Sequence, residues 1–157
     1  VRVPASARRR LGRLLDGVCA EQTMSRDHRK LRVFTLADRL VVEIYRASSD
    51  FPASERYGLQ GQLRKAAVSS AVNIVEGSAR RTDGEYLHFL NISLGSAAET
   101  RYLCGLTERL KYLAAADWQR LDAGYAHLCA GLTALINSLE PSSSKRKAKS
   151  EKATSGA

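Results

Sequence analysis

Two kinds of side chain in this 157-residue sequence could do chemistry: a Glu-x-x-His tetrapeptide and several pairs of basic residues. The tetrapeptide is Glu85-Tyr86-Leu87-His88. Di-metal four-helix bundles use two such motifs and a Glu from each of two other helices, but no other histidine here follows a glutamate by three positions. Glu85 also completes, with Thr82, the pattern of a capping box at a helix start. We therefore expect Glu85 to cap a helix, and we expect neither a metal site nor a cofactor.

Other catalytic patterns are absent from the sequence. There is no G-x-S-x-G nucleophile elbow and no Gly-rich phosphate loop. His127 and Cys129 lie two positions apart, so on a helix their side chains point in different directions and cannot act together. We expect no catalytic residues and no enzyme activity, and a metal-dependent enzyme is the weaker alternative.

The basic residues are the remaining candidates. Arg64-Lys65 lies within a predicted helix and Arg80-Arg81 lies at its end. Lysine and arginine neutralise phosphates in nucleic-acid complexes, so Arg64, Lys65, Arg80 and Arg81 are our candidate nucleic-acid-binding residues. The alternative is that these side chains form the solvated face that any soluble helical bundle needs. No aromatic platform for stacked bases is evident, so sequence-specific RNA recognition is not supported.

The net charge of +9 is spread along the chain. Residues 1–23, 24–139 and 140–157 each carry an excess of three positive charges, so two thirds of the excess lies in the flanks. We expect three regions: a flexible or mis-annotated extension at 1–26, a helical bundle at 27–140 and a disordered basic tail at 141–157. Because Met24 is the only methionine, residues 1–23 would lie upstream of the natural start or form a loose arm.

Apolar residues spaced by three and four predict four helices. Their expected ranges are 30–47, 55–79 with Ser54 as the cap, 82–113 behind the Thr82–Glu85 capping box, and a last helix with a seam of apolar residues from Trp118 to Leu139. The connections are short and no segment alternates with a period of two. The sequence thus predicts an all-α, antiparallel up-down four-helix bundle.

Compartment and membrane association follow from composition. The three cysteines form no CxxC pair, which favours free thiols in a reducing compartment. No apolar run is long enough for a membrane-spanning helix, and the basic N-terminal stretch lacks the features of a signal peptide. We expect a cytoplasmic protein without a membrane partner.

Several ordered segments carry a family resemblance. They are Asp27–Phe34, Phe51-Pro52, Glu55–Leu59, Gln62–Ser69, Asn73–Gly77, Arg80-Arg81 and Phe89–Ser96. Together they resemble a bacterial four-helix-bundle family known from open reading frames in 23S ribosomal RNA intervening sequences. The resemblance covers about residues 27–139. It departs at Ser70-Ala71-Val72, where the family often has Ile-Pro-Ser, and the missing proline implies a straighter second helix.

The resemblance implies a fold more than an activity. It implies an up-down bundle that assembles as a homo-pentamer and is similar to the accessory protein of diversity-generating retroelements, which binds nucleic acid and reverse transcriptase. Arg64-Lys65 and Arg80-Arg81 match basic positions of the family. Val42, Val68 and Tyr102 are candidates for the subunit interface. Our first hypothesis is therefore an oligomeric protein that binds structured RNA or a nucleic-acid-handling partner, and the alternative is an interaction scaffold with no nucleic-acid role.

Overall fold

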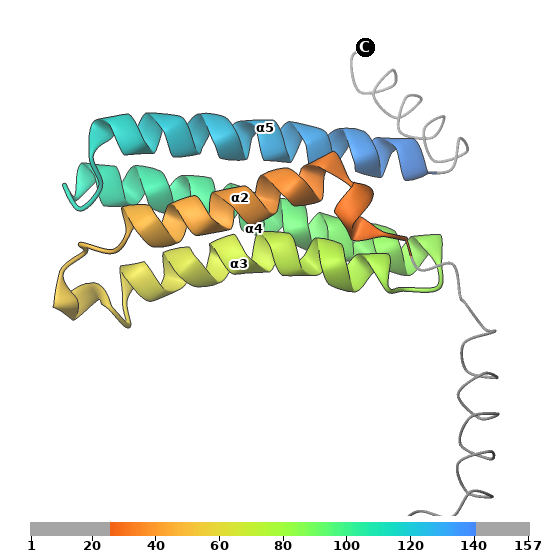
Figure 1. The fold of residues 1–157 in the computed structure, drawn as a ribbon, viewed down its shortest axis with the longest axis horizontal. Helices are drawn as coiled ribbons and strands as arrows, with labels where there is room; N and C mark the ends of the chain where they lie inside the picture. Colours follow the sequence, from red (N-terminus) through yellow and green to blue (C-terminus); the bar gives the residue numbers. More distant parts are fainter. Residues whose placement is uncertain (1–25, 141–157) are drawn as a thin grey trace, which may run out of the picture.

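Four long helices make up most of the computed structural model, which describes residues 26–140 (Figure 1). They are α2 (Arg32–Ala47), α3 (Leu59–Ser78), α4 (Asp83–Arg109) and α5 (Ala115–Leu139), with two short 3-10 helices, η1 (His28–Lys30) and η2 (Ala53–Glu55). The described residues contain no strand. The predicted tail at 141–157 and, apart from Arg26, the predicted extension at 1–26 lie outside the described residues. The prediction of an all-helical, four-helix fold is confirmed.

Each long helix packs against two others. Helix α2 contacts α3 and α5, and α4 contacts the same two helices, whereas the diagonal pairs make no close backbone contact within residues 26–140. Residues late in α3 meet residues early in α4: Gly77 lies against Phe89, and Ser70 lies against Ser93. Figure 1 shows the four helices side by side with their long axes roughly aligned. The ring of contacts surrounds one apolar core.

Helix α2 buries a narrow stripe. Ala37, Leu40 and Ile44 are fully buried, while Leu36, predicted for the same stripe, is only half-buried. The helix begins at residue 32 and not at residue 30, because the preceding residues form η1. The side chain of Asp27 caps η1 by accepting a hydrogen bond from the backbone N–H of residue 29 at 3.1 Å.

The start of α3 differs from the prediction. Ser54 was expected to cap a helix beginning at residue 55, but Ser54 lies within η2 and makes no capping hydrogen bond. The backbone conformation of Gly58 (φ −91°, ψ −122°) separates η2 from α3. The Glu55 carboxylate then accepts a hydrogen bond from the Leu59 N–H at 3.0 Å. The Glu55 carboxylate, and not the Ser54 hydroxyl, therefore accepts a hydrogen bond from one of the free N–H groups at the helix start.

The ends of α4 are both well defined. Thr82 and Glu85 form the predicted capping box, in which each side chain accepts a hydrogen bond from the other's backbone N–H. The helix ends before the predicted residue 113, because Lys111 adopts a left-handed conformation with φ 63°. The N–H groups of Lys111 and Tyr112 donate to the carbonyls of Glu108 and Thr107, which is the hydrogen-bond pattern of a Schellman motif.

Helix α5 carries the seam predicted from its apolar spacing. Leu121, Tyr125, Leu128 and Leu132 are fully buried. Beyond them the core position passes to Ile136, and Leu135 is half-buried, because a straight α-helix with 3.6 residues per turn drifts away from a seven-residue repeat. None of the helices within residues 26–140 is long and apolar enough to cross a membrane.

Candidate nucleic-acid interface

Arg64, the first candidate, contacts the C-terminal end of α2. Its Nε donates to the Ser48 hydroxyl at 2.8 Å, and one terminal nitrogen lies 3.2 Å from the Ser48 carbonyl and 3.4 Å from the Tyr45 carbonyl. The guanidinium also lies over the Tyr45 ring, 4.8 Å from its centroid. Gln60 donates a further hydrogen bond to the Ser48 carbonyl. Because the last carbonyls of a helix lack intrahelical partners and carry partial negative charge, Arg64 and Gln60 together cap α2.

Lys65, the neighbouring residue, is placed differently. It is exposed and lines a shallow cleft of about 410 Å³ with Gln62, Ala66, Ser69 and Glu99. The cleft lies between α3 and α4, which are joined by a 2.9 Å hydrogen bond between the hydroxyls of Ser69 and Ser96. Glu99 places a carboxylate in the same cleft, which reduces its positive potential. Lys65 is therefore available to an anion, but its surroundings are not strongly basic.

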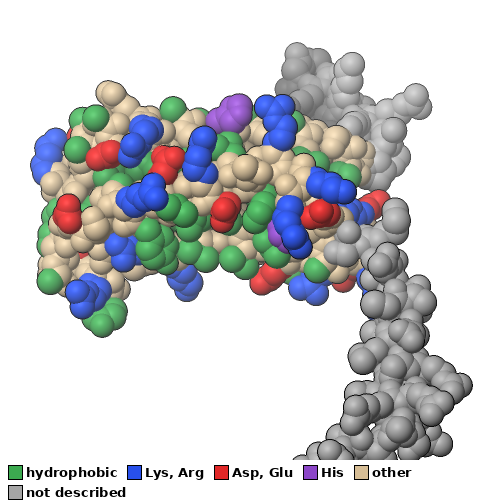
Figure 2. Space-filling model, viewed as in Figure 1, with side chains coloured by type: hydrophobic (Ala, Val, Ile, Leu, Met, Phe, Trp, Pro, Cys, Tyr) green, Lys and Arg blue, Asp and Glu red, His purple; other side chains and the backbone are tan. Residues whose placement is uncertain are grey.

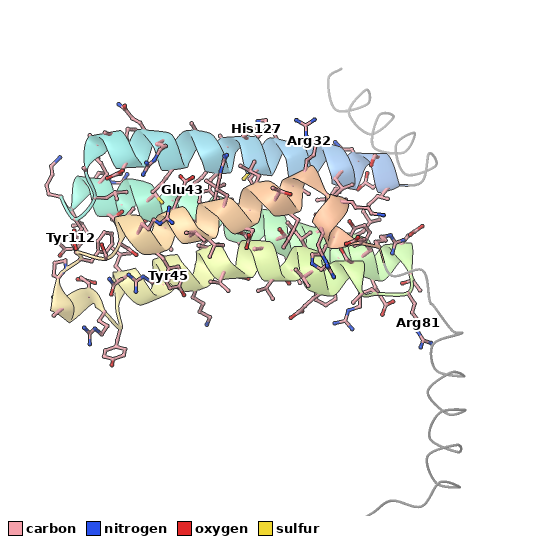
Figure 3. The ribbon with its side chains drawn as sticks, viewed as in Figure 1. Arg32, Glu43, Tyr45, Arg81, Tyr112 and His127 are labelled. Carbon is pink, nitrogen blue, oxygen red and sulfur yellow. The ribbon has the colours of Figure 1, made fainter. Side chains whose placement is uncertain are left out.

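Arg80 and Arg81 lie in the connection between α3 and α4 and are both exposed. The Arg80 guanidinium lies 4.5 Å from the centroid of the Phe89 ring, which holds its stem against α4. Arg81 points away from the bundle at the end of the molecule (Figure 3). Neither side chain makes an ion pair within the described residues. The four candidates thus do not form one cluster: Arg64 and Lys65 lie early in α3, and Arg80 and Arg81 follow its end.

Arg26, like Arg64, is held by contacts within the described chain. Its side chain forms an ion pair with Asp83 and lies over the Tyr86 ring, 4.5 Å from the centroid. Its backbone N–H donates to the Ser78 carbonyl at 3.1 Å. Arg26 therefore ties the start of the described chain to the α3–α4 connection.

Acidic and basic side chains alternate over the face drawn in Figure 2, and no single basic patch covers it. The best-formed pair joins α4 to α5: the Arg101 guanidinium donates two hydrogen bonds to the Asp122 carboxylate, at 2.8 and 2.9 Å. These hydrogen bonds lower the pKa of Asp122 from its ordinary value. They also raise the pKa of Arg101. This pair is a link between helices and leaves neither group free for a ligand.

Glu85, the first residue of the Glu-x-x-His tetrapeptide, has a structural role. The hydrogen bond from the Thr82 hydroxyl, at 2.8 Å, is the main cause that lowers the pKa of Glu85. His88 is exposed, and its ring packs edge-on against Phe89 with the centroids 5.8 Å apart. Within residues 26–140, no group of three His, Cys, Asp or Glu side chains is arranged to hold a metal ion. Glu85 is a helix cap, as its spacing from Thr82 predicted.

The two cysteines in the described region are free. Cys104 is fully buried, and burial raises the pKa of its thiol to about 12. Burial also raises the pKa of Cys129, which is half-buried. Since the thiolate is the reactive form, both side chains pack as small apolar groups at neutral pH.

Sequence reasoning missed a groove between α2 and α5. It has a volume of about 370 Å³ and is lined by Arg32, Thr35, Leu36, Arg39 and His127. The spacing of residues 32, 36 and 39 places them on one helix face, which the sequence could have indicated. That this face lies beside His127 depends on how α2 and α5 pair, which no local pattern reveals.

Among the proposed interface residues, Tyr102 is 63% exposed and Val42 is 44% exposed, while Val68 is half-buried. Tyr57, which was not predicted, is 93% exposed. These residues lie on α2, α3, α4 and the connection before α3.

Comparison with known proteins bears on both fold and family. No curated protein sequence matches the chain significantly. A crystal structure at 1.70 Å of a protein of unknown function from the S23 ribosomal protein family of Bacteroides thetaiotaomicron VPI-5482 is similar, with a TM-score of 0.63 and 20% identity. The match covers 67% of this chain and 95% of that one, and it supports the helical fold. The sequence model of the 23S rRNA-intervening sequence protein family matches residues 29–134. Because that match spans well over half of this chain, the chain belongs to the 23S rRNA-intervening sequence protein family.

Proposed function

We propose that this chain is a non-enzymatic, homo-oligomeric, cytoplasmic protein that binds structured RNA, or a nucleic-acid-handling partner, through basic helix faces. The observation that carries the proposal is that three of the four candidate residues have exposed, unpaired cationic side chains. Lys65, Arg80 and Arg81 are exposed and make no ion pair within the described residues. Such cations can release counterions from RNA without first breaking an internal ion pair. Arg64 contributes least, because its guanidinium already binds α2.

The proposal includes an antiparallel up-down topology and assembly as a pentamer. The contacts of Gly77 with Phe89 and of Ser70 with Ser93 support opposite directions for α3 and α4. The exposed apolar side chains of Val42 and Tyr102 support association between copies. In this proposal the chain is related to the accessory protein of diversity-generating retroelements, and a ring of copies would repeat each basic pair around one axis. Light scattering on the full chain tests the assembly, and a strict monomer would contradict it.

RNA binding is tested by the dependence of affinity on salt. The full chain is titrated with a fluorescently labelled RNA hairpin between about 50 and 200 mM salt, where true phosphate contacts weaken affinity steeply. Replacing Lys65, Arg80 and Arg81 together with glutamine should reduce the slope of log affinity against log salt by about 2–3, since each lost phosphate contact removes slightly less than one. The matched control replaces Arg46, Arg56 and Arg109, which are also exposed.

The alternative function is an oligomeric interaction scaffold with no nucleic-acid role. It is favoured by the 93% exposure of Tyr57 and the 63% exposure of Tyr102, which are large apolar surfaces without a partner in the described chain. If the hairpin binds no better than background at low salt, or if both triple variants lose the same slope, the scaffold replaces the RNA-binding proposal.

A further inference from the structure

The groove between α2 and α5 combines cations with an apolar floor. Arg32, Thr35 and Arg39 line it from α2, and His127 lines it from α5. An adjoining hollow of about 260 Å³ shares Arg32, Leu36 and His127 and adds Val33 and Gly131. Figure 3 shows Arg32 and His127 close together along this edge of the bundle. The two hollows form one continuous surface feature, since three lining residues are common to both.

Two glycines of α5 lie close to apolar side chains of α2. A Cβ atom at Gly131 would lie 2.9 Å from Cγ1 of Val33, and one at Gly124 would lie 2.6 Å from Cδ2 of Leu40. The missing side chains let α2 approach α5 closely. The polar side chains at residues 32, 35 and 39 then stand beside the contact and not within it.

The charged side chains that line the groove itself are cationic. Its lining holds two guanidinium groups, an imidazole and a hydroxyl, and no carboxylate. Residues 123–139 of α5 contain no Asp or Glu. Arg32 makes no ion pair or hydrogen bond through its side chain in the described region, and Arg39 lies 3.5 Å from the half-buried Glu43 carboxylate. Because the Arg39 side chain is 67% exposed, this pair is weak and can yield to a stronger anion.

The end of α2 adds to this positive potential. Arg32 is the first residue of α2, the N-cap Leu31 offers no side-chain hydrogen bond, and the first turn contains no acidic residue. Within the described residues, no acidic side chain at the N-cap or in the first turn offsets the partial positive charge of this helix N-terminus. The arginines and the helix end favour the same kind of ligand group, an anion with several oxygen atoms.

We propose that this groove binds a nucleotide, with its phosphate between Arg32 and Arg39 and its base or ribose on the floor of Val33, Leu36 and Gly131. Guanidinium groups recognise phosphate oxygens in pairs, and a volume of about 370 Å³ lies within the usual range for small-ligand sites. The nucleotide is a free mononucleotide or one residue of an RNA strand. The site is separate from Lys65, Arg80 and Arg81, which belong to α3 and its connection to α4.

Nuclear magnetic resonance of the histidine side chains tests the site, because His127 lines it directly. The full chain is titrated separately with inorganic phosphate, adenosine monophosphate and a short oligouridylate. We expect saturable shifts of the His127 signals with a nucleotide probe, and weaker binding of phosphate alone, which cannot use the apolar floor. Shifts with the monophosphate alone would identify a free nucleotide as the ligand, and shifts with the oligouridylate alone would identify an RNA strand.

Substitutions assign the contacts. Arg32→Gln and Arg39→Gln should each weaken nucleotide binding about tenfold, as expected for one lost charged hydrogen-bonding group. Arg46→Gln is the matched control, since Arg46 is an exposed arginine of the same helix that does not line the groove. Equal loss in Arg46→Gln and Arg32→Gln, no saturable shift of His127 with any probe, or equal affinity for phosphate and nucleotide would each overturn the assignment. The Lys65, Arg80 and Arg81 variant should bind the monophosphate normally, so failure of the groove and failure of the proposed hairpin binding are distinguishable.

Discussion

The α3–α4 and α2–α5 contacts are both built on small residues, but they treat polar groups in opposite ways. Between α3 and α4, the Ser93 hydroxyl donates to the Ser70 carbonyl at 2.5 Å, and the Ser69 and Ser96 hydroxyls bond to each other. Between α2 and α5, Gly131 brings the helices together, and the neighbouring arginines and histidine line an open groove. The first contact uses its polar groups internally, and the second leaves them for a ligand.

The internal contacts of a basic residue indicate whether its side chain is available to bind a ligand. Arg64 and Arg32 are both arginines on helix surfaces, yet Arg64 makes three hydrogen bonds to α2 and Arg32 makes none through its side chain in the described region. A binding role is better supported for the cation that has no internal partner. Charge and spacing alone do not separate the two, because the distinction depends on what lies opposite each side chain.

The largest expected effect concerns the rigidity of the α3–α4 contact. In Gly77→Ala the new Cβ would lie 2.8 Å from Cβ of Phe89, an atom fixed directly to the backbone of α4. The helices must therefore shift, and we expect the free energy of unfolding to fall by about 1–3 kcal/mol. Urea denaturation followed by circular dichroism measures this.

Two glycine variants provide the comparison for Gly77. A Cβ at Gly95 meets nothing within 4 Å, so Gly95→Ala should raise the free energy of unfolding by about 0.5–1 kcal/mol through helix propensity. In Gly131→Ala the crowded atom is Cγ1 of a half-buried valine. Its displacement should offset the propensity gain and leave stability within about 1 kcal/mol of the wild type. If Gly131→Ala costs as much as Gly77→Ala, the two contacts are equally rigid.

The next largest effect separates Arg64 from Lys65. Arg64→Met keeps the aliphatic stem but removes the contribution of Arg64 to the cap on α2, and we expect the free energy of unfolding to fall by about 1–2 kcal/mol. Lys65→Met should change it by less than about 0.5 kcal/mol, because Lys65 is exposed and makes no ion pair in the described region. Equal effects of the two substitutions would show that the hydrogen bonds of Arg64 contribute nothing measurable to stability.

Much of the fold could be predicted from local signals, and the errors have local causes. The Thr82–Glu85 capping box was predicted because both partners lie within one turn. The predicted cap of α3 was wrong because Ser54 lies within η2, and the Glu55 carboxylate accepts the hydrogen bond from the Leu59 N–H instead. The early end of α4 depends on Lys111 adopting a positive φ, which is uncommon for lysine and carries no sequence signal.

The site was less predictable because it depends on pairing between distant segments. The contact between Arg64 and Ser48 crosses from one helix to another, so spacing within α3 could not reveal it. In the sequence, His127 lies two positions from Cys129 and follows no glutamate by three positions, whereas its neighbours in the groove come from α2. Helix periodicity gives the face on which a residue lies, but not the residue that faces it.

A smaller effect tests the one bidentate pair that links α4 to α5. The pKa of Asp122 is lowered in the folded state, so its contribution to stability is present above the unfolded pKa, about 3.9, and is lost as the pH falls through the folded pKa. In Asp122→Asn we expect a loss of about 0.5–1 kcal/mol at neutral pH, because both side chains are partly exposed. The difference from the wild type should shrink below about pH 4, as measured by urea denaturation across pH. A difference that is constant from neutral to acid pH would contradict the assignment to this ion pair.

The smallest expected effect concerns Tyr125, which brings a hydroxyl from α5 to the polar α3–α4 contact. The side chain is fully buried, and burial raises the pKa of its hydroxyl. The hydroxyl is directed toward those of Ser70 and Thr100, but it makes no hydrogen bond of normal geometry. Ser70 and Thr100 donate instead to carbonyls of their own helices, at 2.7 and 2.8 Å.

Tyr125→Phe removes a buried polar group without removing a formed hydrogen bond. The relief of desolvation should offset the lost packing of one oxygen atom, so we expect the free energy of unfolding to stay the same or to rise by up to about 1 kcal/mol. Ser93→Ala is the matched control, since it deletes a buried hydroxyl whose hydrogen bond is formed, and it should cost about 0.5–1.5 kcal/mol. A loss in Tyr125→Phe equal to that in Ser93→Ala would mean that Tyr125 belongs to the hydrogen-bonded α3–α4 contact. The polar groups of that contact would then all be satisfied, and its contrast with the open α2–α5 groove would be sharper.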